Sequence, residues 1–556
     1  MIPFDEAHRA VHYPPDRRFR IWIRPLGLAI LAVIVLLPVI LAWIQAAMFG
    51  LPDIPPSSVS AEATASGPHG FPGWVRWSHF FNMLFLFMLM RSGFSILMEH
   101  PRLYLNDHCT PGTEWLRLTP IKVPKDKLWT AKEDARYISP IVGTPGYRHT
   151  VGLARSWHFL TVYGFALTGV FFVCACLTSG HWHRLVPASL SVFPEAWKFF
   201  VYYANLRLPP EPNSFCAYNP LEQLAYAGTI YVMAPLSILT GLVMSPAIVN
   251  RWPVYGKLFG GRQCARSIHF LILVGFTLFV VAHVALVALT GLRRNMNHIV
   301  LGTDEAGWTG LALGTIGLTA VVITWIAAHY ISWYSPRRVQ RTYRLISEPL
   351  LSVTLDRLTP PKRIYSPSDI SPRLWPNGKL PVRDDWKQMA ANGFKDFRLK
   401  ITGLIDNPME LSLEDLRAMA TEDTITMQHC IQGWSGIAAW RGVLIRKLVE
   451  QVKPKRDAKV LAFYSFGEAL FGGSYYDTQR ITDAIEHNAI LALEMNGAPL
   501  TDVYGAPLRL RIENQLAYKM VKWIERIEFV QSVELLGKGE GGSSEDDDFY
   551  DVLPNI

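Results

Sequence analysis

Four histidines lie within long apolar stretches, where a polar side chain is costly and usually marks a function. Two of them, His269 and His283, are 14 residues apart, so on one helix they share a face and stand about 21 Å apart along its axis. His79 and His158 come from two further apolar stretches. Two pairs at two depths are what two bis-histidine haems stacked across a membrane require. For each histidine taken singly, a hydrogen bond to a neighbouring helix remains the alternative.

The six cysteines do not indicate a metal cluster or disulfides. They stand at positions 109, 174, 176, 216, 264 and 430, and none forms a CxxC pair. Zinc ribbons, thiolate-bound iron–sulfur clusters and c-type haem attachment therefore have no support.

The elements that must position the histidines are predicted to be membrane helices. The chain is 50% hydrophobic and 18% charged, with a mean hydropathy of +0.16, whereas soluble domains average about 25% charged residues. This composition excludes a disordered chain, a disulfide-stapled secreted module and a purely cytosolic globule. We predict a multi-pass protein of the bacterial cell membrane. Residues 1–335 would form an all-α bundle of six spans, each near the roughly 20 residues that cross a bilayer, at about 25–48, 75–98, 152–178, 222–246, 264–291 and 310–334.

The distribution of lysine and arginine predicts the orientation of this bundle. The connections at 1–24, 99–151 and 247–266 hold 17 of these residues, and the alternate connections hold five. The positive-inside rule then places both ends of the bundle in the cytoplasm. His79 and His283 would lie toward the outer leaflet, and the other pair toward the inner leaflet. Topology also explains the net charge of +8, so no nucleic acid partner is expected.

The histidine-bearing segments resemble a known family. WVRWSHFFNMLF, ARSWHFLTVYGF and ARSIHFLILVGFTLFVVAHV resemble the dihaem cytochrome b proteins, of the cytochrome b561-like type, that serve formate dehydrogenases, hydrogenases and thiosulfate reductases. The resemblance implies a four-helix core and electron exchange with membrane quinone. An additional helix precedes the core here, which would invert it relative to the usual arrangement. The resemblance implies two b-type haems with the iron ligands His79, His158, His269 and His283.

Three further polar residues of the bundle have two interpretations each. His329, near the end of the sixth span, is either an alternative ligand or a polar group at the interface, and we favour the second. Arg91 and Arg155 either meet haem propionates, because cations suit carboxylates, or extend to the lipid headgroups.

Beyond the last span, the sequence predicts a connector and a soluble domain. Residues 336–395 lose periodicity and collect prolines, which is typical of a connector that lies over a surface. Residues 396–535 then read as an α+β domain, with a helix capped at Ser412 and another in GVLIRKLVEQV. Residues 536–556 form an acidic tail that packs its aromatic end or stays mobile. The expected strands are FRLKITGL, DTITMQHC, KVLAFYSF, LALEMNG and PLRLRIEN.

The soluble domain carries the second resemblance. MQHCIQGWSGIAAWRGVLIRKLV and LALEMNGAPLTDVYGAPLRLRIENQLAYKMVKWIERIEFV resemble the sulfite oxidase-type molybdopterin domain. The resemblance implies that the Cys430 thiolate binds molybdenum, as a soft ligand for a metal that changes its oxidation state. It also implies contacts to the pterin cofactor and its phosphate from Asn377, Ser465, Arg509, Met520, Val521 and Lys522.

The substrate pocket is less clear from the sequence. Ile431, Gln432 and Gly433 follow the cysteine. In animal and plant sulfite oxidases, which this domain resembles, the corresponding motif contains arginines that draw in an anion. An anion such as sulfite is therefore less favoured. His429 is the candidate catalytic partner of Cys430. The candidates to line the pocket are His429, Gln432, Tyr475, Tyr476 and Lys519.

Together, the two halves predict a membrane oxidoreductase. Electrons would pass between quinone, two haems and Mo-molybdopterin, and an oxygen atom would move to or from a small substrate. Reduction of a sulfoxide or N-oxide is the first hypothesis, and oxidation of a small sulfur compound or aldehyde with quinone as acceptor is the second. A redox sensor or assembly partner is the non-enzymatic alternative. We expect a bilayer, quinone, a small substrate and a possible homodimer as partners, and a cytoplasmic soluble domain, with the periplasm as the alternative.

Overall fold

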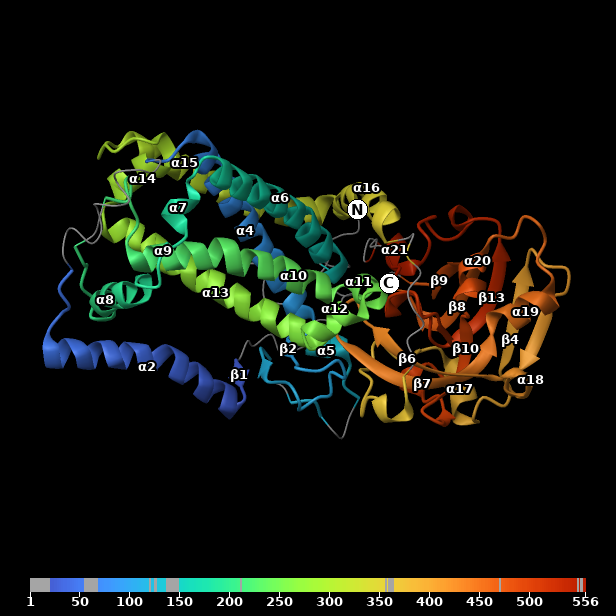
Figure 1. Ribbon diagram of the computed structural model, residues 1–556. Coiled ribbons are helices and arrows are strands. Elements are labelled where there is room, and N and C mark those ends of the chain that lie inside the picture. Colours follow the sequence, from blue (N-terminus) through green and yellow to red (C-terminus); the bar gives the residue numbers. More distant parts are fainter. Residues whose placement is uncertain are drawn as a thin grey trace.

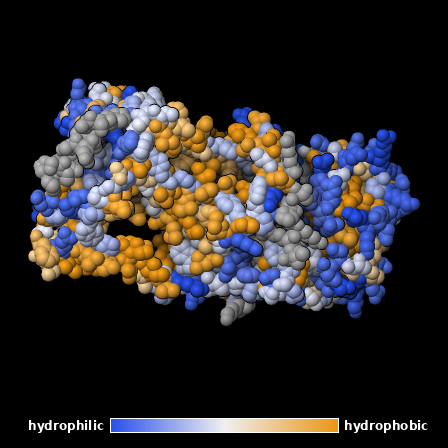
Figure 2. Space-filling view, viewed as in Figure 1, coloured by the Kyte–Doolittle hydropathy of each residue, from blue (hydrophilic) through white to orange (hydrophobic). Residues whose placement is uncertain are grey.

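The computed structural model has two regions joined end to end (Figure 1). A helical bundle occupies one end and a sheet-rich domain the other. Figure 2 shows hydrophobic residues gathered over the bundle, whereas the sheet-rich domain presents a mostly hydrophilic face. The structure describes residues 21–54, 69–119, 122–124, 128–136, 150–210, 213–355, 358, 365–469, 472–547, 550 and 554–556.

The six predicted spans are confirmed as helices, with ends within two residues of those expected. They are long and apolar enough to cross a membrane, and most of their side chains are exposed, as expected where lipid covers them. The fifth carries His269 and His283, and the fourth contains a π-helical turn, η2 (Gly228–Met233), between two α-helical parts. The helices are α2 (Pro25–Phe49), α4 (Gly73–Glu99), α6 (Val151–Thr178), α9 with α10 (Pro220–Ala227 and Ala234–Met244), α13 (Arg262–Leu289) and α15 (Thr309–Tyr334).

Helix α2 stands apart from the other spans along most of its length (Figure 1). At its far end it meets α8 (Val192–Ala204), where the Trp43 indole donates to the Ala204 carbonyl at 2.7 Å. At its start, β1 (Trp22–Ile23) pairs with β3 (Leu116–Arg117) in a small sheet completed by β2 (Arg102–Leu103). The additional helix is therefore attached at both ends.

The remaining short helices close the two ends of the bundle. At the end away from the soluble domain these are α7 (Trp182–Leu185) and α14 (Leu292–Leu301). At the opposite end lie α5 (Ala131–Asp134), α11 (Pro246–Arg251) and α12 (Pro253–Leu258).

The connector differs from the prediction in its first part. Residues predicted to lack periodicity form helix α16 (Pro336–Thr354). Its first residue, Pro336, suits a helix start because the proline lacks an N–H that would be unpaired there. Val339, Tyr343 and Ser347 are buried at a four-residue spacing, which is the pattern of an amphipathic helix. Proline content concealed that pattern. Pro360 and Pro361 lie outside the described residues.

The soluble domain is built on two sheets, which confirms the α+β class. One sheet has the order β5-β4-β13-β8-β9, with β4 and β13 parallel. The other has the order β11-β10-β7-β6, with β12 paired to β10. The strands are β4 (Arg398–Gly403), β5 (Met409–Ser412), β6 (Glu422–His429), β7 (Ser435–Leu444), β8 (Val460–Glu468), β9 (Ser474–Arg480), β10 (Ile490–Met495), β11 (Ala498–Pro499), β12 (Arg509–Arg511) and β13 (Ile524–Val530).

Short helices precede or connect several of these strands. Helix α18 (Leu413–Met419) is capped as predicted, since the Ser412 hydroxyl accepts from the Asp415 N–H at 3.1 Å. Helix α19 begins at Ile445 and ends at Val452. It begins later than predicted because the preceding Gly-Val-Leu belongs to β7. Helix α17 (Asp384–Ala391) precedes β4, and helix α20 (Ile481–Glu486) lies between β9 and β10.

The acidic tail packs on the soluble domain over its described part. Helix α21 (Ser543–Asp546) lies beside β9, where the Ser543 hydroxyl accepts from the Tyr476 N–H at 2.9 Å. At the end of the chain, the Ile556 N–H donates to the Asn514 carbonyl at 2.8 Å. Residues 548–549 and 551–553 lie outside the described residues.

Candidate functional site

The bundle brings the four predicted histidines together as two pairs. The ring centroids of His79 and His283 are 6.2 Å apart, and those of His158 and His269 are 6.3 Å apart. A metal–imidazole bond is about 2.0 Å long. Two such bonds together with half the width of each ring fill this separation. Each pair therefore fits an iron ion held between two imidazoles, as in a bis-histidine haem.

Hydroxyl groups orient the rings of the second pair. The Nδ1 of His158 lies 3.0 Å from the Ser92 hydroxyl, and the Nδ1 of His269 lies 3.0 Å from the Thr240 hydroxyl. Both hydroxyls already donate to backbone carbonyls, so each accepts an N–H from the imidazole. The proton then sits on Nδ1, which leaves the Nε2 lone pair for a metal.

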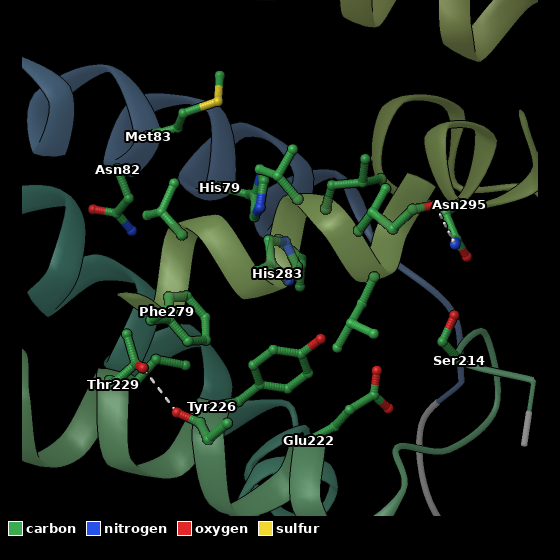
Figure 3. A pocket seen from close by; sticks show the side chains of 18 of the residues that line it. His79, Asn82, Met83, Ser214, Glu222, Tyr226, Thr229, Phe279, His283 and Asn295 are labelled. Carbon is green, nitrogen blue, oxygen red and sulfur yellow. Dashed lines mark hydrogen bonds between the residues drawn. The ribbon is translucent and has the colours of Figure 1, made fainter. Parts of the chain in front are cut away.

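The other pair opens onto a cavity of about 2380 Å³. Phe279 stacks on the His283 ring at 5.6 Å, and Tyr226 meets that ring edge-on at 6.0 Å. Figure 3 shows Asn82 and Met83 on the helix that carries His79, and Tyr226 and Glu222 on the opposite wall. Pockets for a single ligand usually measure about 300–1,000 Å³, so this cavity has room for a haem and for a further molecule.

In the soluble domain, Cys430 lies in a tight loop at the end of β6. Its N–H donates to the Trp434 carbonyl at 3.0 Å, and its carbonyl accepts from the Gly433 N–H at 3.0 Å. Gly433 has a φ of 105°, a conformation that favours glycine. Burial raises the pKa of the Cys430 thiol to about 12. The thiol therefore ionises near neutral pH only when a cation such as a metal takes the place of the proton.

Buried cations gather where the pterin and its phosphate were predicted. The guanidinium groups of Arg509 and Arg511 both lie over the Trp440 ring, at 4.8 and 4.5 Å from its centroid. The Nε atoms of both arginines are buried without a hydrogen-bond partner among the described residues. Burial, together with Arg511, lowers the pKa of Arg509 to about 9, and burial beside Arg509 holds the pKa of Lys522 well below its usual value. Such a cluster fits an anionic cofactor, which would supply the missing negative charge.

The four other predicted cofactor residues lie against this cluster. The Lys522 ammonium donates to the carbonyl of Asn377 and, at 2.9 Å, to that of Val503. The Ser465 hydroxyl donates to the Lys522 carbonyl at 2.7 Å, so it holds the turn in place. The Met520 sulfur lies 2.9 Å from an Arg511 nitrogen, and Val521 is buried beside it. The structure thus brings Asn377, Ser465, Met520, Val521 and Lys522 close to Arg509 and Arg511.

The predicted pocket residues separate into two groups. Gln432 and His429 lie beside Cys430, and the Cys430 sulfur is 3.8 Å from the Gln432 Oε1. Tyr475 and Tyr476 face opposite sides of β9, as neighbouring strand residues do. Tyr476 packs in a separate hydrophobic cluster and donates to Asp546 at 2.5 Å. The Lys519 ammonium pairs with two buried carboxylates, Asp477 and Glu545.

The junction between bundle and soluble domain adds residues that the sequence did not suggest for this site. The Arg155 guanidinium of α6 lies 3.5 Å from the Ile431 carbonyl, and that of Arg262 in α13 lies 3.5 Å from the His429 Nδ1. The Glu99 carboxylate at the end of α4 accepts from the Gln432 amide at 3.3 Å. The bundle therefore contributes two cations and a carboxylate to the Cys430 loop. Charges at the ends of spans were the available signal, but spacing along the chain does not relate them to residue 430.

The two other polar residues that had alternative interpretations, His329 and Arg91, lie on α15 and α4. His329 belongs to neither histidine pair, and its ring meets Tyr330 and Trp333. Arg91 is 5% exposed and remains within the bundle.

His100, directly after α4, is a candidate functional residue that the sequence interpretation missed. Its ring is fully buried, and neither nitrogen has a hydrogen-bond partner among the described residues. Burial, followed by the nearby Arg266, lowers its pKa to about 3, so the imidazole is neutral. It stands beside Trp375 at 5.0 Å, between the bundle and the segment that leads to Asn377.

Comparison with known protein families assigns each half of the chain. Residues 70–301 match the family model of prokaryotic cytochrome b561. Residues 386–535 match the model of the oxidoreductase molybdopterin binding domain. The chain therefore joins a cytochrome b561-like membrane domain to a sulfite oxidase-type molybdopterin domain, which confirms both resemblances.

Several curated proteins are similar over part of their length. The protein-methionine-sulfoxide reductase catalytic subunit MsrP of Campylobacter jejuni is 28% identical over 173 residues, 29% of this chain and 58% of that protein. The putative protein-methionine-sulfoxide reductase subunit YedZ1 of Azospira oryzae is 30% identical, over 24% of this chain and 48% of that protein. The uncharacterized oxidoreductase YuiH of Bacillus subtilis is 28% identical, over 30% of this chain and 82% of that protein. The chain spans about half the length of the first two relatives.

Proposed function

We propose that this chain, which joins a cytochrome b561-like bundle to a molybdopterin domain, passes electrons from membrane quinol to a small substrate that it deoxygenates. Two b-type haems would be held by His79 with His283 and by His158 with His269. Mo-molybdopterin would be held by Cys430 and by the cluster around Arg509 and Lys522. When bound, it supplies the exchange of an oxygen atom and two electrons per turnover.

One observation carries this proposal: both helices that hold the inner histidine pair also touch the Cys430 loop. Arg155 precedes His158 by three residues, and Arg262 precedes His269 by seven, which is about 5 and 10 Å along a helix. Their guanidinium groups reach the backbone of Ile431 and the ring of His429. The loop and the haem pair are thus linked through packed, hydrogen-bonded protein with few steps between them.

The residues around Cys430 have distinct roles in this scheme. The closed Cys430–Trp434 loop holds the sulfur in a buried position that excludes water. Gln432 lies between Cys430 and Glu99 and contacts both. Reduction of a sulfoxide consumes two protons, and the Glu99 carboxyl is placed to bring one of them to the Gln432 side of the loop.

A sulfoxide is the favoured substrate class. Two of the similar proteins are named as methionine-sulfoxide reductases or their subunits, and the proposal extends that class to this chain. A neutral sulfoxide oxygen is a strong hydrogen-bond acceptor, which suits the donors near the Cys430 loop.

A second candidate function, oxidation of a small sulfur anion with quinone as acceptor, has an observation in its favour. The residues after Cys430 lack arginine, but the bundle brings Arg155 and Arg262 to the same loop. Two buried guanidinium groups attract an anion. The structure therefore removes the main reason that the sequence offered against a substrate such as sulfite.

The soluble domain is proposed to lie in the cytoplasm. It packs against the end of the bundle that carries the connections rich in lysine and arginine (Figure 1). Arg102, Arg117, Arg136, Arg262 and Arg266 are buried among them, so structural roles account for part of the excess. The remaining basic residues still outnumber those of the opposite side. A reporter fused after Ile556 that is active only in the periplasm would overturn this placement.

A substrate screen that follows the haems tests the proposed function. The purified full chain is first assayed for molybdenum and for b-haem absorbance, and the haems are then reduced with a quinol. A methyl sulfoxide is expected to reoxidise them. Reduction of oxidised haems by sulfite, with no response to sulfoxides, would favour the second function. Protein without molybdenum, or haems that respond to neither substrate, would overturn the proposal.

A further inference from the structure

The cavity beside His79 and His283 extends past this pair to the end of the bundle that is farthest from the soluble domain (Figure 1). Apolar side chains from α4, α6, α9, α10, α13 and α15 form most of its wall. Polar groups gather at the outer end, where Ser214, Asn295 and His298 line it, and Figure 3 shows Ser214 and Asn295 on that side. The cavity thus combines an apolar interior beside a haem position with a polar outer end.

A line of polar atoms leads from this cavity to solvent. The Ser214 hydroxyl lies 3.3 Å from the Nδ1 of His298, and the Nε2 of His298 lies 2.7 Å from the Asp304 Oδ1. The His298 side chain is 3% exposed, whereas that of Asp304 is 30% exposed. Phe71 stacks on the His298 ring at 5.7 Å, which keeps the imidazole in this orientation.

The carboxylate at the outer end of this line is held in its charged form. Arg294 donates to it at 2.6 and 2.8 Å, and the Asn213 amide donates to it at 2.6 Å. These hydrogen bonds, that from Arg294 first, lower the pKa of Asp304. An ionised carboxylate on one imidazole nitrogen stabilises the imidazolium that forms when the other nitrogen accepts a proton.

We propose that Ser214, His298 and Asp304 form the proton exit of a quinol-oxidising site in this cavity. The inference rests on the proposed function, which takes its electrons from quinol. Oxidation of a quinol releases protons as well as electrons. The histidine pairs offer no route for these protons, whereas this relay does. The cavity has an apolar interior and a polar outer end. This combination suits a quinol, because its ring and tail are apolar and its two hydroxyls are polar.

Both O–H bonds of the quinol break, which gives a quinone, two electrons and two protons. The electrons leave one at a time toward the His79–His283 pair. His298 takes one proton at Nδ1 through the Ser214 hydroxyl, is stabilised by Asp304 as an imidazolium, and releases the proton to water at the exposed side of Asp304. The proton that is released comes from Nε2, so a half-turn of the neutral imidazole must bring its unprotonated nitrogen back to Ser214 before the ring takes the second proton.

Stopped-flow reduction of the haems in the purified full chain tests this proposal. A soluble quinol such as duroquinol is the reductant in one experiment, and dithionite, which needs no proton acceptor, is the reductant in the other. A positioned base contributes about 10²–10⁴-fold to a rate. His298→Gln is therefore expected to slow reduction by quinol about a hundredfold and to leave reduction by dithionite unchanged. Asp304→Asn, a more conservative change, is expected to slow the quinol reaction about tenfold.

His183→Gln is the matched control. His183 lies at the same end of the bundle, stacks on Trp182 at 3.7 Å and does not line the cavity, so both rates should stay at the wild-type values. Unchanged quinol rates in His298→Gln and Asp304→Asn would overturn the relay. Equal slowing with dithionite would overturn it too, because the residues would then support the haem itself. If substrates fail to reoxidise the haems while quinol still reduces them in a His298-dependent way, the proposed function fails and the relay stands.

Discussion

Within the bundle, each proposed haem position lies between two histidines on long helices. The Cys430 site is instead assembled from loops and strand ends of the soluble domain together with side chains of the bundle. The 14-residue spacing of His269 and His283 determines their separation on α13. In contrast, the residues around Cys430 come from α4, α6 and α13 as well as from β6. We therefore expect the two centres to tolerate change differently: each proposed haem depends on single ligands, whereas the cysteine loop depends on a junction between domains.

The largest expected effect separates the two centres. Cys430→Ser replaces a soft thiolate by a hydroxyl that binds molybdenum poorly, and it is expected to abolish substrate turnover. The haem spectrum should stay the same because the histidine pairs lie in another domain. Absorbance and substrate-driven haem reoxidation measure both. Cys264→Ser is the control, because Cys264 is partly exposed on α13 and does not line the cavity beside His79 and His283. Turnover that survives in Cys430→Ser would contradict the assignment.

The next prediction divides the two haem pairs. His269→Ala removes a ligand of the inner pair and is expected to lower the haem content from two per chain to one, with loss of electron passage to the soluble domain. The pyridine haemochrome of the purified protein measures the content. His329→Ala should retain both haems, because His329 belongs to neither pair. Full haem content in His269→Ala would show that the ligand set is wrong.

A third prediction tests how far the junction depends on buried charge. Arg102 donates to Asp134 at 2.7 and 2.8 Å, and both are almost fully buried. Asp134→Asn removes one of the two buried carboxylates that pair with Arg102, the other being Glu114 at 2.8 Å. It should cost about 3 kcal/mol, measured as a lower apparent melting temperature. Arg341→Gln is the control: Arg341 is 60% exposed in its pair with Glu540, so at most about 1 kcal/mol is expected.

The same pair predicts a pH dependence. Burial alone would raise the pKa of Asp134, but Arg102 outweighs it and holds this pKa below the usual value. The stabilisation is therefore present above the unfolded-state pKa of about 3.9 and is lost as the pH falls through the lower folded-state pKa. The difference in melting temperature between wild type and Asp134→Asn should shrink below about pH 4. A difference that grows in acid would contradict this sign.

The smallest expected effect concerns the link between the centres. Arg155→Gln removes the 3.5 Å contact between α6 and the Ile431 carbonyl. A hydrogen bond from a charged group is worth about 1.5–3 kcal/mol, and this one is long, so we expect about a tenfold slower reoxidation of the haems by substrate. Reduction by dithionite should not change. Arg251→Gln is the control, because Arg251 donates to the Leu355 carbonyl of the connector. Equal rates in both variants would show that Arg155 is not part of the link.

Much of the fold was accessible to sequence interpretation because hydrophobic length is a local property. Six apolar stretches predicted six helices, and the capping Ser412 predicted the start of α18. The connector was the exception. Pro336 and Pro349 suggested an irregular chain, yet one starts α16 and the other is tolerated within it, since a proline at a helix start costs no hydrogen bond.

The proposed cofactor residues of the soluble domain were predicted from motifs, but the hydrogen bonds that some of them make were not. Ser465 was expected to touch the pterin, and its hydroxyl donates to the Lys522 carbonyl. Tyr475 and Tyr476 were expected in one pocket, and strand alternation directs them to opposite sides. Roles of this kind depend on hydrogen bonds between segments far apart in the chain.

By itself, the sequence determined the spans, the two histidine pairs and the cysteine motif, because helical rise, hydrophobicity and local motifs act over a few turns of chain. Only the tertiary structure decided that Glu99, Arg155 and Arg262 meet the Cys430 loop, and that Ser214, His298 and Asp304 form a line from a cavity to solvent. The physical reason is that burial and charge pairing depend on which helix ends face which loops. That choice is made when the bundle and the soluble domain pack together.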